Sequence, residues 1–208
     1  MCFTVNVNLI KEELENRYVA TLIDPDKYRP SYYYHAFAFP DLPAICSDSP
    51  EKIRLLKWGL IPSWVKSSDA ADEMRLKTFN ARSDSVDNKP SFSSSFKTKR
   101  CILPVAGFFE WQHRGKENIP WYINHSENEI ISLAGLYDEW VDNTTGLTIP
   151  TFSIVTSDAN ILMSEIHNSA RRLSEAEAHS SLLSTVLFAP VPTTGFLIIL
   201  VRRSLCVV

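Results

Sequence analysis

The sequence predicts one α+β domain, residues 1–208, with a curved, largely antiparallel, barrel-like β-sheet flanked by short helices. Short apolar and aromatic runs separated by turn residues fill the middle of the chain, without the regular strand–helix alternation of a parallel sheet. No Gly/Ser/Pro-rich linker divides the 208 residues, a length that suits one domain with a substantial core.

The first half of the chain predicts these elements in order. "KEELENRY" (11–18) predicts a short helix, and "YYYHAFAF" (32–39) predicts an aromatic strand. "IRLLKWGL" (53–60) predicts a second strand, and "SSDAADEMRLK" (67–77) predicts a helix with a Ser or Asp cap. "NKPSFSSSFKTK" (88–99) predicts a polar loop with two exposed Phe residues.

The second half predicts four stretches of strand and then two helices. The helices are expected at 157–167, where apolar residues follow a cap at helical spacing, and at 174–184. The expected strand stretches are "RCILPVAGFFEWQ" (100–112), "PWYINH" (120–125), "IISLAGLYDEW" (130–140) and "TFSIVTSD" (151–158).

The composition predicts an ordinary soluble globular protein, since hydrophobic residues are 45% and charged residues 22% of the chain. The start turns polar too soon for a signal peptide or an anchor. Prolines and a glycine interrupt the apolar stretch 185–208, which therefore predicts a buried terminal strand. The four cysteines lie too far apart for a CxxC zinc pattern, so we expect reduced thiols and no metal site.

A basic segment stands out against a net charge of −3. Between Arg75 and Arg100 the chain carries seven Lys and Arg residues against two Asp residues. This segment is either a solvated loop or a strip that binds the phosphates of a nucleic acid.

Cys2 directly follows the initiator methionine, so removal of Met1 would give it a free α-amine beside its thiol. Such a 1,2-aminothiol condenses with an aldehyde to an imine, and the thiol then closes a five-membered thiazolidine ring. An N-terminal cysteine can also serve a hydrolase, with the α-amine as base. The alternative is a small buried residue at the start of a strand.

Four further residues could take part in chemistry. Asn80, in "FNARSDS", can hold an oxyanion or a sugar hydroxyl, or can form an Asx-turn. Arg82 can pair with a phosphate or bridge to Asp84. Glu110, in "GFFEW", lies among aromatic rings that would favour its protonated form and suit it to acid–base catalysis, unless it faces solvent. His167 is either a proton shuttle or a helix cap.

Taken in order, "MC", "WGLIPSW", "FNARSDS", "RCILPVAGFFEW" and "IH" resemble the SRAP family, the SOS-response-associated peptidase-like proteins that shield abasic sites in DNA. The resemblance is clear over about residues 1–172. It implies that Cys2 cross-links the ring-opened abasic sugar, that Asn80 positions the cysteine and sugar, that Glu110 moves protons and that His167 lies near the sugar hydroxyls.

The resemblance also implies the DNA-contacting residues and the partner. Single-stranded DNA with abasic sites is the expected partner of a cytoplasmic, nucleoid-associated protein, and no metal or organic cofactor is needed. Trp58 and Trp64 would border the DNA, and Trp111 would stack on a base or fill the core. The expected phosphate-contacting set is Arg82, Lys77, Lys99 and Arg100.

The chain departs from the family pattern at both ends. Phe3 and Thr4 follow the cysteine where relatives have Gly and Arg, so one phosphate contact is missing. After about Arg172 the sequence no longer matches. Two other functions stay open: a peptidase or amidohydrolase with a Cys2 nucleophile and an Asn80 oxyanion donor, and a non-covalent DNA-binding module. The sequence leaves the oligomeric state open, and also whether Met1 is removed autocatalytically or by a host aminopeptidase.

Overall fold

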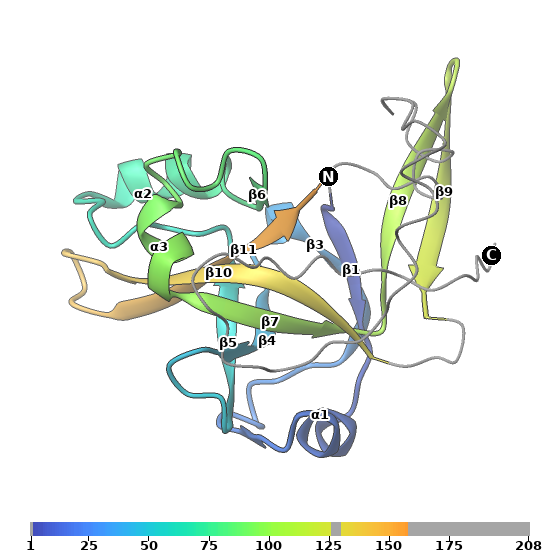
Figure 1. Cartoon of the computed structure of the whole chain (residues 1–208), viewed down its shortest axis with the longest axis horizontal. Coiled ribbons are helices and arrows are strands. Elements are labelled where there is room, and N and C mark those ends of the chain that lie inside the picture. The colour runs from blue at the N-terminus through green and yellow to red at the C-terminus, as the bar shows by residue number, and fades with distance from the viewer. Residues whose placement is uncertain (1, 126–129, 158–208) are drawn as a thin grey trace.

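The computed structural model describes residues 2–125 and 130–157. Its strands form two sheets that meet at the beginning of the chain (Figure 1). The strands are β1 (Thr4–Val7), β2 (Thr21–Leu22), β3 (Ser31–His35), β4 (Asp41–Cys46), β5 (Lys52–Trp58), β6 (Asn80–Arg82), β7 (Arg100–Val105), β8 (Gly107–Arg114), β9 (Glu117–Asn124), β10 (Ile131–Val141) and β11 (Thr148–Thr156).

Five strands close into a barrel. The larger sheet has the order β2–β5–β4–β7–β10–β11–β6, and β11 also pairs with β5, so that β4, β5, β7, β10 and β11 complete a ring. The pairs between β4 and β5, β4 and β7, β7 and β10, and β10 and β11 are antiparallel. The predicted barrel-like, largely antiparallel architecture is confirmed.

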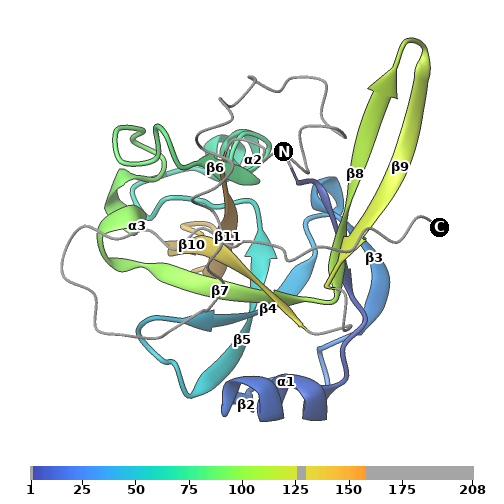
Figure 2. The ribbon, with the colours of Figure 1, turned by 45° about the vertical axis from the view of Figure 1, so that its right-hand side comes forward.

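The second sheet has the order β3–β1–β8–β9, and all of its pairs are antiparallel. The β8–β9 hairpin projects away from the barrel, and the chain start lies between this hairpin and the α2–β6 region in both ribbon views (Figures 1 and 2). One apolar core serves both sheets, since Val5 of β1, Trp58 of β5 and Phe152 of β11 belong to the same buried cluster.

Within the described residues, three short α-helices flank the sheets: α1 (Lys11–Tyr18), α2 (Ser68–Arg75) and α3 (Ser93–Thr98). The first two confirm the helices predicted at 11–18 and 67–77. Ser67 is the predicted cap of α2, since its hydroxyl oxygen accepts a hydrogen bond from the Ala70 backbone N–H at 3.3 Å. At the start of α1, the Glu13 carboxylate accepts a hydrogen bond from the Ile10 backbone N–H. Both helices therefore begin where a polar side chain satisfies a backbone donor that has no partner within the helix.

Two local predictions were wrong. The segment 88–99 contains α3 rather than only a loop, because Phe92 is buried against Leu60, Ala81 and Leu136 and this packing outweighs the weak helix propensity of the serines. The aromatic strand predicted at 32–39 ends at His35 and continues as a 3₁₀ turn, Ala36–Ala38, which stops at Phe39 with a left-handed φ of 50°.

The strands predicted at 53–60, 100–112, 120–125, 130–140 and 151–158 are confirmed in their described parts as β5, β7 with β8, β9, β10 and β11. The helices expected at 157–167 and 174–184 lie outside the described residues, except for Ser157. The terminal strand expected in 185–208 also lies outside them.

A close backbone approach explains the glycine of "AGFFEW". A Cβ atom at Gly107 would lie 2.6 Å from the ring of Tyr122 and 2.7 Å from the Ile123 carbonyl oxygen. The Tyr122 hydroxyl accepts a hydrogen bond from the Asn6 side chain at 2.7 Å, which ties β9 to β1 across Gly107. Gly107 therefore lets the first strand sit tightly beside the hairpin.

Candidate functional site

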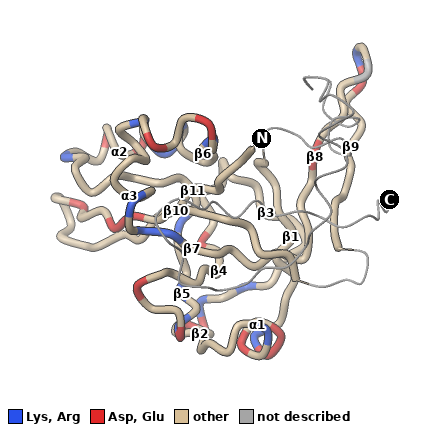
Figure 3. The backbone as a smooth tube through the Cα atoms, in the orientation of Figure 1, with Lys and Arg blue, Asp and Glu red and all other residues tan. Residues whose placement is uncertain are grey.

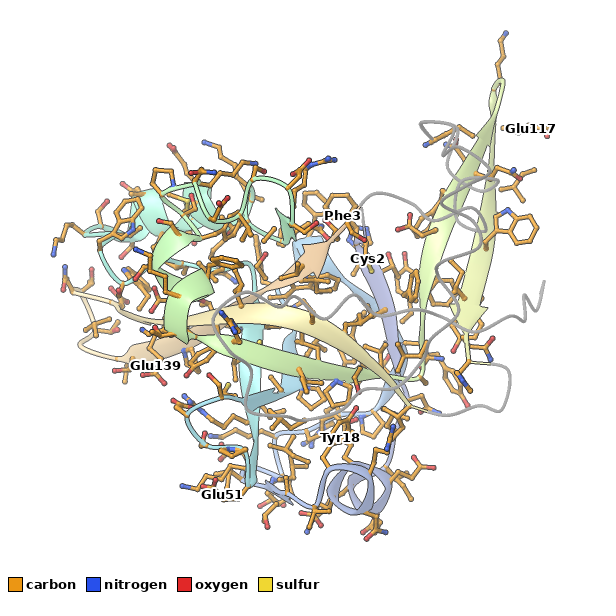
Figure 4. All side chains as sticks on the ribbon, in the orientation of Figure 1. Cys2, Phe3, Tyr18, Glu51, Glu117 and Glu139 are labelled. Atoms are coloured by element: carbon orange, nitrogen blue, oxygen red, sulfur yellow. The ribbon has the colours of Figure 1, made fainter. Side chains whose placement is uncertain are left out.

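Cys2 lies at the head of β1 and is buried, with 7% of its surface exposed. Its thiol donates a weak hydrogen bond to the Thr4 carbonyl oxygen, with sulfur and oxygen 3.7 Å apart. Figure 4 shows Cys2 between the β1 strand and the β8–β9 hairpin. The central position of β1 between β3 and β8 fixes where the chain begins.

Asn80 reaches Cys2 from the other sheet. The Asn80 Nδ2 donates a hydrogen bond to the Cys2 carbonyl oxygen at 2.9 Å, joining residues 78 positions apart. Asn80 begins β6, whose pairing with β11 carries it to this place. Its Oδ1 is buried and has no hydrogen-bond partner among the described residues. An unsatisfied buried acceptor beside a thiol is available to a ligand that donates a hydrogen bond.

Glu110 lies on β8, next to the chain start. Because Thr4 pairs with Phe109, continuation of that register brings Glu110 beside Phe3, the neighbour of Cys2. Only 6% of Glu110 is exposed, which excludes the alternative that it faces solvent from an alternating strand. Burial and the nearby Glu110 carboxylate together raise the pKa of the Cys2 thiol to about 12.

Three of the four predicted catalytic residues, Cys2, Asn80 and Glu110, thus gather at one place from β1, β6 and β8. The fourth, His167, lies outside the described residues. Because the Cys2 thiol stays protonated at neutral pH in this setting, it needs a proton acceptor before it can react as a nucleophile.

The predicted tryptophans have three different environments. Trp58 is fully buried, stacks on Phe152 with centroids 5.9 Å apart and donates its indole N–H to the Phe79 carbonyl oxygen at 3.0 Å. The predicted direct contact of Trp58 with DNA is therefore wrong, because its ring fills the barrel core. Trp64 is 48% exposed, and Trp111 is half-buried on β8 opposite Pro120.

The predicted phosphate-contacting residues form two groups. Lys77 and Arg82 flank Asn80 in sequence and are exposed, and Arg82 pairs with Asp84, with the guanidinium Nη2 2.5 Å from a carboxylate oxygen. Lys99 and Arg100 stand at the start of β7, three strands away from β6 along the sheet.

The second group is also more constrained. Lys99 pairs with the buried Asp138 at 2.5 Å, and Arg100 donates to the Phe96 carbonyl oxygen. Figure 3 shows acidic and basic residues interspersed along the α2–β6 segment, whereas α3 and β7 carry only basic residues, so the basic segment is not a continuous strip. Lys77 and Arg82 are the members nearest in sequence to Asn80, the residue that contacts Cys2.

A hollow of about 190 Å³ opens beside the Asn80 side chain. Three of the residues that line it, Phe3, Leu76 and Phe79, were not predicted as site residues from the sequence. The aromatic run at residues 32–39 was the available signal that aromatic rings gather near this place. Phe3 packs edge-on against Phe79, with ring centroids 6.2 Å apart. The hollow is lined by Phe3, Leu76, Lys77, Phe79 and Asn80.

The other described cysteines, Cys46 and Cys101, are buried and have free thiols. They lie opposite each other in the register of β4 and β7. Among residues 2–125 and 130–157, no group of three or more His, Cys, Asp and Glu side chains is placed to hold a metal ion. In the same part of the chain, no helix has the length and apolar character needed to cross a membrane.

The fold is a small closed barrel joined to a second sheet, and a buried cysteine precedes the first strand by two residues. These features define the class of protein to which the chain belongs. The chain belongs to the SRAP family: the family model described as "SOS response associated peptidase (SRAP)" matches residues 1–185.

Relatives with assigned names agree with this family. The chain is 33% identical over 172 residues to the abasic site processing protein HMCES of Xenopus tropicalis, covering 70% of this chain and 50% of that protein. It is 33% identical over 144 residues to the abasic site processing protein YoaM of Bacillus subtilis, covering 68% and 60%. The chain thus spans about half to three fifths of the length of these relatives.

Solved structures match the fold. A protein from Bacteroides thetaiotaomicron has a TM-score of 0.77 and 39% identity, covering 83% of this chain and 75% of that one. A protein from Bordetella bronchiseptica has a TM-score of 0.70 at 19% identity, covering 82% and 80%, and this similarity concerns the fold alone.

Proposed function

We propose that this protein captures abasic sites in single-stranded DNA as a covalent thiazolidine adduct of Cys2. The observation that carries the proposal is the hydrogen bond from Asn80 Nδ2 to the Cys2 carbonyl oxygen, next to buried Glu110. It fixes the backbone of a residue that would otherwise be a fraying chain end. Two relatives named abasic site processing proteins supply the class of DNA lesion.

The reaction starts once Met1 is removed, because only then does Cys2 have a free amine. The α-amine adds to the aldehyde carbon of the ring-opened abasic sugar, and loss of one water gives an imine. The Cys2 sulfur then bonds to the same carbon, and the thiol proton passes to the nitrogen. The product contains all atoms of the aminothiol and the aldehyde except that water.

Glu110 is the proton carrier in this scheme. The buried Cys2 thiol holds its proton at neutral pH, so ring closure needs a base within reach. The Glu110 carboxylate already acts on the Cys2 thiol electrostatically, and it can take the thiol proton and return it to the nitrogen. The same group can protonate the sugar oxygen that leaves when the ring opens.

Asn80 is the positioning residue. Its Nδ2 is used by the Cys2 carbonyl, while its buried Oδ1 is available to accept a hydrogen bond from the α-amine or a sugar hydroxyl. Lys77 and Arg82 are close to Asn80 in sequence and supply positive charge for the phosphates. We include His167 as a further proton-transfer residue on the basis of the family resemblance.

Removal of Met1 belongs to the same proposal. The Cys2 thiol attacking the Met1 carbonyl carbon would break the Met1–Cys2 peptide bond and form a thioester with a free α-amine. Hydrolysis of this thioester by water would release methionine and restore the thiol, in keeping with the peptidase in the family name. A host aminopeptidase would produce the same mature chain. Either route fits a protein that works on DNA in the cytoplasm near the nucleoid.

One denaturing gel tests the proposal. The protein is mixed with a single strand that contains one abasic site, denatured without reductant and examined for a slower-migrating adduct. A peptidase or amidohydrolase with no DNA chemistry gives no adduct, and a reversible DNA-binding module gives a complex only before denaturation. An adduct that resists denaturation and requires Cys2 supports the proposal; its absence contradicts it.

A further inference from the structure

A continuous series of aromatic rings crosses the second sheet and ends beside Cys2. Successive ring centroids are 4.9, 5.8, 6.3, 5.4 and 5.7 Å apart. These are the usual separations of interacting aromatic rings. We call this series the ring ladder, and it consists, from the hairpin inward, of Tyr122, Phe109, Tyr33, His35, Phe37 and Phe3.

The strand register puts four of the six rings, those of Tyr122, Phe109, Tyr33 and His35, on one face of the sheet. Phe109 pairs with Tyr122, and Thr4 pairs with both Phe109 and His35, so these side chains share a face of the antiparallel sheet. Tyr33 stacks on His35 with an interplanar angle of 15° and also touches Phe109. The rings therefore form a row that runs across β9, β8 and β3.

The middle of the ladder is open to solvent. Tyr33 is 55% exposed and Phe37 is 52% exposed, unusual values for rings that already have aromatic neighbours. Strands β1 and β3 contain no Lys, Arg, Asp or Glu, and Figure 3 draws them without charged colours. The exposed rings thus lie on an uncharged band.

The ladder leads into the candidate site. Its last ring, Phe3, is the residue after Cys2 and also lines the hollow with Lys77 and Asn80. Figure 4 shows Phe3 and Cys2 side by side at the head of β1. A DNA strand whose abasic sugar lies at Cys2 would have its neighbouring nucleotides next to these rings.

We propose that the ring ladder is a base-stacking platform for the nucleotides on one side of the abasic site. The identity of the strand rests on the proposed function. Every base has a flat face that can stack on an aromatic ring, so such a platform holds single-stranded DNA without reading its sequence. Lys77 and Arg82 supply positive charge for the phosphates of the DNA backbone. The ring ladder supplies the part of the affinity that comes from stacking with the bases.

The experiment compares two strands of about 12 nucleotides, within the range bound by single-stranded DNA-binding folds. One is oligothymidine, and the other has the same sugar–phosphate backbone with tetrahydrofuran residues in place of every base. Neither strand has an aldehyde, so fluorescence anisotropy measures reversible binding only. The ratio of the two dissociation constants isolates the contribution of the bases.

The test variant is Tyr33→Ala/Phe37→Ala, and the control is Tyr32→Ala. Tyr32 is 69% exposed and neighbours Tyr33 but takes part in none of the ladder's ring contacts. We expect the unmodified protein and Tyr32→Ala to bind oligothymidine at least about tenfold more tightly than the base-free strand, from the usual strength of base–aromatic stacking. The test variant should lose most of this preference while its affinity for the base-free strand is unchanged.

A ring-keeping variant separates stacking from folding. Tyr33→Phe/Phe37→Tyr keeps both rings and should retain the base preference, and circular dichroism should show the test variant folded. If the folded test variant keeps the preference, or if Tyr32→Ala loses it equally, the ladder only stabilises the sheet and the proposal is overturned.

The outcome is independent of the covalent chemistry. A base preference that depends on Tyr33 and Phe37, in a protein that forms no adduct with abasic DNA, would overturn the proposed function and keep the ladder as a reversible binding site. An adduct without any ladder-dependent base preference would overturn the ladder and leave the proposed function standing.

Discussion

The Asn80 side-chain amide donates a hydrogen bond to the Cys2 carbonyl oxygen at 2.9 Å and so fastens the first strand of one sheet to the edge strand of the other. This bond sets the position of the residue at which the proposed chemistry takes place. The Oδ1 atom of the same side chain is buried and has no partner among the described residues, so it is available to accept a hydrogen bond.

Replacement of Asn80 tests this relationship. Asn80→Ala removes the hydrogen bond to Cys2 and should lower the free energy of unfolding by about 0.5–1.5 kcal/mol, the usual net value of one such bond. It should also slow cross-linking of abasic DNA, because the Cys2 backbone is no longer fixed. Urea unfolding and gel kinetics measure the two effects. Asn88→Ala is the control and should change neither, since Asn88 is exposed and its side chain donates to the neighbouring Asp87.

Substitution of Cys2 should separate the two bonds of the adduct. Cys2→Ala and Cys2→Ser keep the α-amine and should still form an imine that borohydride traps, but a hydroxyl is a far poorer ring-closing nucleophile than a thiol. Without reductant these variants should give no adduct that survives denaturation, whereas Cys46→Ala and Cys101→Ala should retain it. A stable adduct from Cys2→Ala would rule out the aminothiol mechanism.

The maturation state of the chain gives a second check on Cys2. The active protein should lack Met1 when examined by intact mass spectrometry, because an acylated amine cannot form an imine. Retention of methionine on a protein that cross-links DNA with full activity is incompatible with the proposed route.

Glu110→Gln should separate proton transfer from binding. The amide keeps nearly the same shape but cannot exchange the proton of the Cys2 thiol, so cross-linking should slow by roughly 10²–10⁴-fold, the usual contribution of general acid–base catalysis. Affinity for an intact strand should change little. Single-turnover gel kinetics measure the rate. Glu117→Gln, on an exposed carboxylate at the tip of the same hairpin (Figure 4), should react at the unmodified rate. If Glu110→Gln reacts equally fast, Glu110 carries no proton in this reaction.

The ion pair between Arg82 and Asp84 predicts opposite effects of its two partners on DNA binding. Both side chains are about half exposed, 50% and 53%, so the pair is weak and can give way to a phosphate. Arg82→Ala should weaken binding to intact and abasic strands alike and reduce the salt dependence by about one unit, whereas Asp84→Asn should strengthen binding. Anisotropy titrations at several salt concentrations measure both. Arg17→Ala, on α1 far from the chain start in Figure 1, should leave the salt dependence unchanged.

Buried thiols predict a loss of stability at alkaline pH. Burial raises the pKa of Cys46 from its ordinary 9.0 to about 12. Above pH 9 the unfolded state therefore loses this proton while the folded state keeps it, and the free energy of unfolding falls by up to about 1.4 kcal/mol per pH unit for each such thiol.

The comparison with Cys46→Ala isolates this effect, because all other titrating groups contribute to both proteins. The difference in stability between the two should shrink as pH rises from about 9 towards 12, since only the unmodified protein has the Cys46 thiol to ionise. Urea unfolding at several pH values measures it. Parallel curves would show that the Cys46 thiol ionises as readily in the folded protein as in the unfolded chain.

The sequence by itself determined the identity of the central residues. The position of Cys2 behind Met1, and the motifs around Asn80 and Glu110, are local properties of the chain, and so is the cap of α2. Local sequence also predicted a curved antiparallel sheet, because strand propensity and turn residues act over a few positions.

Only the tertiary structure decided which side chains are buried and which meet. Trp58 and Trp64 belong to one short motif, yet Trp58 lies in the barrel core and Trp64 is exposed. The burial of each ring depends on strands elsewhere in the chain. The helix α3 forms because Phe92 finds a buried partner surface on residues remote in sequence. The ring ladder and the hydrogen bond between Asn80 and Cys2 likewise form only when strand register and barrel closure bring distant segments together. Strand register is set by long-range pairing rather than by local propensity.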